Sequence, residues 1–128
     1  MVGYLEDDAR LIVAYGIVEA VRRARGGRVS LTVAGVLAYA RAHVPIAGIA
    51  YERFKRGGRP ALFWLVRDYL NVLVWRGLVT IWPRRKNPLY VVERGSRLWE
   101  LARADPRGAV EYIMGVLGSQ KAPGITGG

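Results

Sequence analysis

The chain of 128 residues has no cysteine, one histidine and only 10 acidic residues. The absence of cysteine excludes disulfides and thiolate metal sites. The single histidine, His43, has no paired carboxylates near it at helical spacing, whereas a metal site needs three or four ligands. The sequence also lacks a Gly-rich phosphate loop with a Lys-Ser/Thr ending and a Gly-x-Ser-x-Gly elbow. We therefore expect a protein that is not an enzyme and that needs no metal or other cofactor.

Long apolar runs are also missing, since none reaches the ~18 residues that a membrane span requires. Glu6, Asp7 and Asp8 precede the first apolar run, whereas a signal peptide begins with basic residues. The sequence therefore predicts a soluble cytoplasmic protein with no membrane partner.

Cations, by contrast, are abundant. The 20 Lys and Arg residues give a net charge of +10 and a pI near 10.7, and they cluster at residues 22–28, 53–59 and 84–86. Such an imbalance indicates an acidic partner, with nucleic acid first and an anionic membrane surface second. The alternative is a charge that only keeps the protein soluble. Arginine far outnumbers lysine, which fits a thermophile with a GC-rich genome, and we expect an archaeal source.

Local signals predict one domain over residues 1–120, followed by a flexible Gly/Pro-rich tail at 121–128. Asp7 or Asp8, Thr32 and Ser96 are candidate N-caps, and Pro45 must break or kink the chain. Glycine pairs end two of the helices. The expected helices are 8–25, 33–43, 46–55, 60–76, 97–103 and 106–117, and the expected strands are 28–31, 78–82 and 89–93.

The stretch from Arg76 to Glu93, RGLVTIWPRRKNPLYVVE, is the most informative part of the chain. Two β-rich runs flank a polar turn bounded by prolines, which predicts a hairpin with three consecutive cations at its tip. A helix that runs through Arg-Gly-Leu-Val into a basic-tipped hairpin resembles the winged-helix family. The expected fold class is mainly α with a small antiparallel β-hairpin (α+β), a winged helix-turn-helix with extra N- and C-terminal helices.

The resemblance covers roughly residues 28–97 and implies binding to double-stranded DNA. The helix 60–76 would be the recognition helix and residues 83–88 the wing, with phosphate contacts providing most of the affinity. The protein would then be a transcriptional regulator or an architectural chromatin factor, associated with the nucleoid. The implied contacts are Arg84, Arg85 and Lys86 in the wing; Arg56, Arg59, Arg67 and Asn71 in the helix and at its start; and Arg25, Arg28, Arg53 and Lys55 as additional phosphate contacts.

Two features leave other functions open. Residues 44–59 separate the second helix from the proposed recognition helix, whereas a helix-turn-helix uses three or four. Trp64 and Trp75 lie on the face expected to read DNA, and large aromatics there favour contact with protein or with unpaired bases. The alternatives are therefore a protein-interaction module in a transcription or replication assembly, or a binder of RNA or single-stranded DNA.

The terminal helices predict a homodimer. Helix 8–25 is apolar on two sides, so it needs two partners, of which one is the core and the other can be a second subunit. The last helix adds further apolar surface through Val110, Ile113, Met114 and Leu117.

Overall fold

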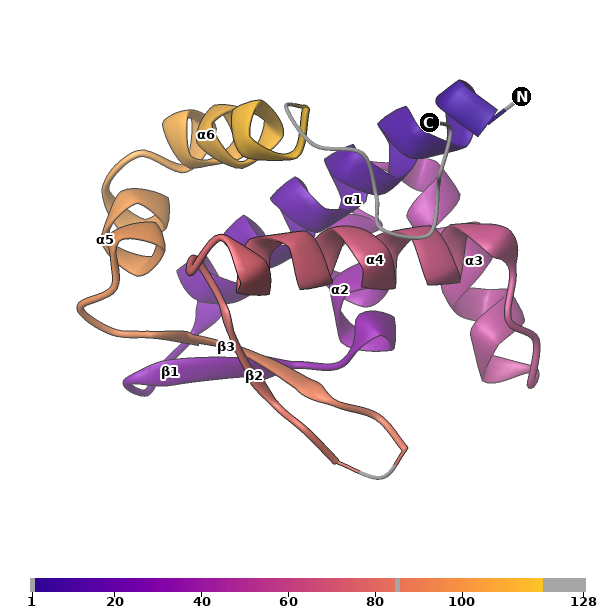
Figure 1. Cartoon of the computed structure of the whole chain (residues 1–128), viewed down its shortest axis with the longest axis horizontal. Coiled ribbons are helices and arrows are strands. Elements are labelled where there is room, and N and C mark those ends of the chain that lie inside the picture. Colours follow the sequence, from indigo (N-terminus) through magenta and orange to yellow (C-terminus); the bar gives the residue numbers. More distant parts are fainter. Residues whose placement is uncertain (1, 85, 119–128) are drawn as a thin grey trace.

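The computed structural model describes residues 2–84 and 86–118, and it is mainly helical with a small antiparallel sheet (Figure 1). Arg85 and the predicted tail at 121–128 lie outside the described residues. The predicted order of helices and strands is confirmed. The elements are α1 (Val2–Arg23), β1 (Arg28–Leu31), α2 (Val33–Ala40), α3 (Pro45–Lys55), α4 (Ala61–Trp75), β2 (Thr80–Trp82), β3 (Leu89–Glu93), α5 (Arg97–Ala104) and α6 (Pro106–Gly118).

Helix α1 is the central element, and it packs against α2, α4, α5 and α6. Its residues Ile12, Val13 and Ile17 are fully buried. The predicted start at Asp8 was wrong, because the helix already begins at Val2. Asp7 is therefore an internal residue rather than a cap, and its carboxylate accepts a hydrogen bond from Arg10 at 2.6 Å.

The two apolar sides of α1 are covered by the chain itself. Helix α6 contributes Ile113 and Leu117, which are both fully buried, while Val110 and Met114 are half-buried against the same core. The apolar pattern of α1 therefore does not require a second subunit.

The segment before α4 contains a separate helix rather than a kinked continuation of α2. Helix α2 has its predicted Thr32 cap, whose Oγ1 accepts a hydrogen bond from the Gly35 amide at 3.0 Å. It ends at Ala40 rather than at the predicted His43, and α3 begins at Pro45, whose fixed φ suits the first turn of a helix. Gly57 then takes a φ of +94°, which turns the chain out of α3 toward α4.

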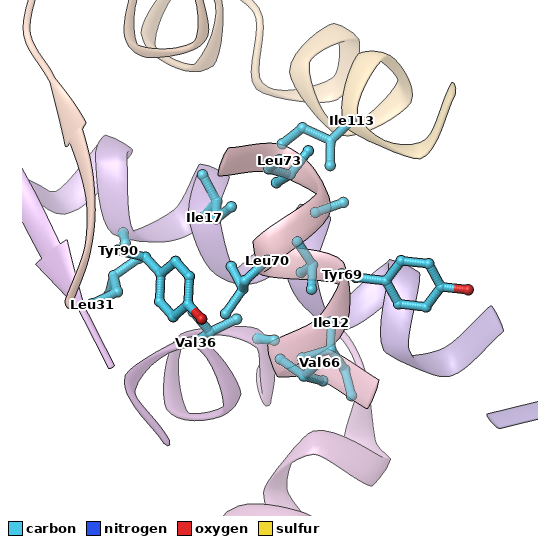
Figure 2. Close-up of a cluster of buried hydrophobic side chains, with 14 of the residues drawn as sticks. Ile12, Ile17, Leu31, Val36, Val66, Tyr69, Leu70, Leu73, Tyr90 and Ile113 are labelled. Carbon is cyan, nitrogen blue, oxygen red and sulfur yellow. The ribbon is translucent and has the colours of Figure 1, made fainter. Parts of the chain in front are cut away.

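Helix α4 crosses the core with Leu62, Val66, Tyr69 and Leu73 buried on one side and Leu65 half-buried beside them. Figure 2 shows Leu70 among the buried side chains, while the Tyr69 ring points away from it with its hydroxyl outward. That hydroxyl donates a hydrogen bond to Glu6 Oε1 at 3.2 Å. Burial raises the pKa of Tyr69 above its usual value.

The sheet has the strand order β1-β3-β2, and both pairs are antiparallel. Strand β2 is shorter than predicted because Leu78 lies in the turn that follows α4, where its amide donates a hydrogen bond to the Leu73 carbonyl at 2.9 Å. Tyr90 and Val92 face the core. Val91 points to the opposite face, yet it is only 1% exposed. Its diagonal neighbours there are Arg28 and Trp82, and the Arg28 guanidinium lies over the Trp82 ring at 4.9 Å.

The last two helices both begin with a side-chain cap, of which Ser96 was predicted. Ser96 Oγ accepts a hydrogen bond from the Trp99 amide at 3.2 Å, and Asp105 Oδ1 accepts one from the Gly108 amide at 3.0 Å. These caps satisfy amides that have no partner within the helix.

Candidate nucleic-acid interface

Four elements meet around a groove of about 570 Å³. They are the start of α2, the end of α3, the start of α4 and the turn between β2 and β3. Figure 1 shows the hairpin and the end of α3 on the same side of α4. The groove is lined by Thr32, Val33, Ala34, Phe54, Arg59, Phe63, Trp64, Arg67, Lys86, Asn87 and Pro88.

Arg59 is held in the groove by two aromatic rings. Phe54 and Phe63 stack with ring centres 5.2 Å apart and an interplanar angle of 7°. The Arg59 guanidinium lies 4.4 Å from the centre of the Phe54 ring and 5.4 Å from that of Phe63. Its Nη1 donates a hydrogen bond to the Gly58 carbonyl at 3.0 Å. Because cation–π contact restrains the side chain without neutralising it, Arg59 keeps its full charge for a ligand.

Arg67 is restrained in a different way. Its Nη2 donates to Asp68 Oδ1 at 3.2 Å, and its guanidinium lies 4.8 Å from the centre of the Trp64 ring. Asp68 is itself largely buried, with only 9% of the residue exposed. The neighbouring carboxylate offsets part of the charge of Arg67. Arg67 is therefore a weaker anion contact than Arg59.

The hairpin turn contributes Lys86 to the lining of the groove, and Arg84 lies in the same turn. Lys86 is exposed and lines the groove, and Arg84 Nε donates to the Asn87 carbonyl at 2.8 Å, which ties the turn together. Arg85, the third predicted wing residue, lies outside the described part of the chain.

The groove carries no carboxylate among its described lining residues. Arg59, Arg84 and Lys86 form no ion pair within residues 2–84 and 86–118. The sequence from 53 to 88 holds nine Lys and Arg residues against one acid, so it contains most of the net charge of +10. A positive field therefore gathers around this groove, which raises the local concentration of polyanions.

The positive surface continues from the groove along the end of α3. Arg53 and Arg56 share a shallow depression with Arg59, and both are exposed. The Lys55 Nζ lies 5.5 Å from the centre of the Tyr51 ring. Among the predicted contacts, Arg53 and Arg56 therefore lie on the same surface as Arg59.

Three predicted contacts lie elsewhere. The backbone of Arg28 pairs with Glu93, at the end of β3 farthest from the hairpin turn. Its guanidinium reaches the Trp82 ring at the end of β2 and does not line the groove, and Arg25 precedes β1. Asn71 is half-buried, and its Oδ1 accepts a hydrogen bond from the Tyr90 hydroxyl at 2.7 Å. The carboxamide of Asn71 thus holds α4 to the sheet. We leave Arg25, Arg28 and Asn71 out of the interface.

Sequence reasoning missed Phe54, Phe63 and the start of α2 as lining residues. One signal was available, because these two phenylalanines are the only ones in the chain and they flank the Arg56-Gly57-Gly58-Arg59 turn. Their stacking brings the end of α3 to the start of α4, and such a contact across a turn cannot be read from helical periodicity.

On another face, His43 stacks on Tyr15 with ring centres 4.9 Å apart, and its Nε2 lies 3.3 Å from Glu19 Oε1. Within the described ranges, no cluster of His, Asp or Glu could hold a metal ion, and no helix combines the length and apolarity that a membrane span needs. Comparisons with protein-family models, with curated proteins and with solved structures find no match to this chain.

Proposed function

We propose that this protein is a winged-helix DNA-binding protein that contacts duplex DNA mainly through phosphates. The order α1-β1-α2, then α4-β2-β3, supports this proposal, as does the β1-β3-β2 sheet with a basic turn between its last two strands. Helix α3 would be an insertion between the two helices of the helix-turn-helix. The observation that carries the proposal is the groove, where Arg59 and Lys86 approach from separate elements with no carboxylate among the described lining residues.

The contacts favour a largely sequence-independent mode of binding. Of the predicted base-reading residues, Asn71 is bonded to Tyr90, and Arg67 is restrained by Asp68 and Trp64. The exposed cations around the groove are better suited to phosphates, which position a protein on DNA without reading its sequence. An architectural factor associated with the nucleoid therefore fits better than a regulator of a single target site.

A titration of labelled duplex DNA, followed by fluorescence anisotropy at low salt, tests this proposal. The double variant Arg59→Gln/Lys86→Gln removes two charges from the groove, and Arg97→Gln/Arg107→Gln removes two from α5 and α6. Both variants have the same net charge. We expect at least a tenfold loss of affinity for the first variant and a much smaller loss for the second. Equal losses would show that only total charge matters, and the groove would not be the interface.

The protein-interaction alternative rests on Trp75, which is 77% exposed near the end of α4 and does not line the groove. An exposed tryptophan is a common anchor of protein interfaces. If Trp75 serves a protein partner, Trp75→Ala leaves DNA affinity unchanged in the same titration. A loss of DNA affinity in Trp75→Ala would instead assign this tryptophan to the nucleic-acid interface.

A further inference from the structure

Phosphate binding alone does not explain the aromatic residues of the groove. Cations suffice for a DNA backbone, yet this groove also contains Phe54, Phe63 and Trp64. Trp64 is 42% exposed, so part of its ring is open to a ligand. The groove volume of about 570 Å³ lies within the range of pockets that enclose small organic groups.

The position of Trp64 is fixed before any ligand arrives. The Phe63 ring meets it edge-on, with ring centres 5.2 Å apart and an interplanar angle of 85°. The Arg67 guanidinium lies over the Trp64 ring at 4.8 Å from its centre. A side chain restrained in this way loses little conformational entropy when a planar group stacks on it.

Two cations from different segments line the same groove as this aromatic surface. Arg59, held over Phe54 and Phe63, comes from the turn between α3 and α4, and Lys86 comes from the hairpin turn. A planar aromatic group with a negative charge on either side matches this arrangement. In a nucleic-acid strand, such a group is a base between its two phosphates.

We propose that the groove takes one unstacked base of the bound strand, which stacks on Trp64 while Arg59 and Lys86 hold the flanking phosphates. This inference rests on the proposed nucleic-acid function and names the substrate feature that the groove recognises. Taking a paired base out of a duplex opposes binding, whereas a base that is already unpaired carries little of this penalty. The protein therefore prefers duplexes with a bulged base over fully paired DNA.

The expected preference follows from the strength of stacking. A base stacked on an aromatic side chain contributes roughly 5- to 150-fold in affinity. We expect binding to a duplex with a one-nucleotide bulge to be about tenfold tighter than binding to the intact duplex. Trp64→Ala should remove this difference, while Trp64→Phe, which keeps a ring, should retain part of it.

The test compares three duplexes of the same sequence by anisotropy. One is fully paired, one carries a single bulged base, and one carries an abasic bulge at the same position. The abasic bulge keeps the phosphate and the flexibility but removes the ring, so it isolates the contribution of stacking. Trp75→Ala is the matched control variant, and circular dichroism checks that each variant is folded. A 2-aminopurine base in the bulge should lose fluorescence on binding if it stacks on Trp64.

The outcomes separate this inference from the proposed function. Tight binding of the bulged base, weak binding of the abasic bulge and loss of the difference in Trp64→Ala support the base pocket. Equal affinity for the bulged and abasic duplexes overturns it and leaves duplex binding intact. A preference that survives Trp64→Ala also overturns it, because the base then stacks elsewhere. Failure to bind any of the three duplexes removes both proposals.

Discussion

Gly16 lies at the closest approach of α1 to α2, and its replacement by alanine is the sharpest test of this packing. A Cβ at Gly16 would lie 2.6 Å from the Val36 carbonyl oxygen and 2.7 Å from Val36 Cγ1. Both residues are buried, and one of the two contacts is backbone, so a simple side-chain rotation cannot relieve the overlap. The two helices must move apart by several tenths of an ångström, against the packing of α1 on the rest of the core.

The expected size of the effect combines two opposing contributions. Overpacking of a tight core destabilises by roughly 1–3 kcal/mol and occasionally more. Alanine is a better helix former than glycine by about 1 kcal/mol, which offsets part of this loss. Because the overlap involves backbone, we expect an overpacking cost near the upper end of this range, about 3 kcal/mol. Subtracting the gain in helix propensity of about 1 kcal/mol leaves a net loss of about 2 kcal/mol. For a chain of this size, that corresponds to a fall in Tm of roughly 6–10 °C.

Gly115 provides the matched control for Gly16→Ala. It also lies within a helix, α6, but a Cβ there meets nothing within 4 Å in the described structure. Gly115→Ala should therefore raise stability by about 0.5–1 kcal/mol. Thermal and urea unfolding, followed by circular dichroism, measure both variants. If Gly16→Ala is as stable as Gly115→Ala, α1 and α2 do not pack as described and the account of the core is wrong.

Three further predictions concern the remaining parts of the molecule. Burial disfavours the Glu19 carboxylate, but hydrogen bonds from Arg23 and His43 and the charges of Arg23 and Arg22 outweigh burial and lower its pKa. The stabilisation by Glu19 is therefore present above the unfolded-state pKa and is lost as pH falls through the lower folded-state pKa. Urea midpoints should show Glu19→Gln less stable by about 1 kcal/mol at neutral pH and equal to the wild type in strong acid; a pH-independent difference would contradict this. Ser96→Ala, which removes the cap of α5, should lower stability by roughly 1 kcal/mol, and an unchanged Tm would show that the cap is unimportant. The homodimer also remains a proposal, although the chain itself covers both apolar sides of α1; light scattering that reports a monomer at high concentration would remove it.

The order of helices and strands was predictable because its signals are local. Thr32 and Ser96 accept the capping hydrogen bonds expected of them, and the chain breaks between two helices at Pro45, as expected. Each of these residues bonds to, or restricts, the backbone within four positions of itself in the sequence. The start of α1 was mispredicted because its signal was also local. The acidic pair Asp7-Asp8 resembles an N-cap, but it is equally compatible with an internal turn of a helix.

The candidate site was only partly predictable. Charge clustering identified Arg59 and Lys86, since a surplus of cations is visible in the sequence. The place of Arg28 over Trp82 depends on the pairing of three strands, and the bond between Asn71 and Tyr90 joins residues 19 positions apart. Such contacts are set by tertiary packing, which helical periodicity does not contain.

Gly16 illustrates the same limit in the core. Within an apolar helical stretch, a glycine gives only a weak signal of lower helix propensity. Its importance arises from the Val36 carbonyl of another helix, 20 residues further along the chain. The sequence therefore allowed α1 to be placed as a buried helix, but it did not indicate which residue allows α2 to approach it.

The salt dependence of duplex affinity tests the central claim most directly. Each neutralised phosphate contributes about −0.9 to the slope of log affinity against log salt. If the exposed cations Arg53, Arg56, Arg59, Arg84 and Lys86 each meet a phosphate, the wild-type slope is about −4 to −5. The slope of Arg59→Gln/Lys86→Gln should then be shallower by about two, while Arg97→Gln/Arg107→Gln keeps the wild-type slope. Duplex binding that is indifferent to salt, or the same slope in all three proteins, would contradict a phosphate-binding surface at this groove.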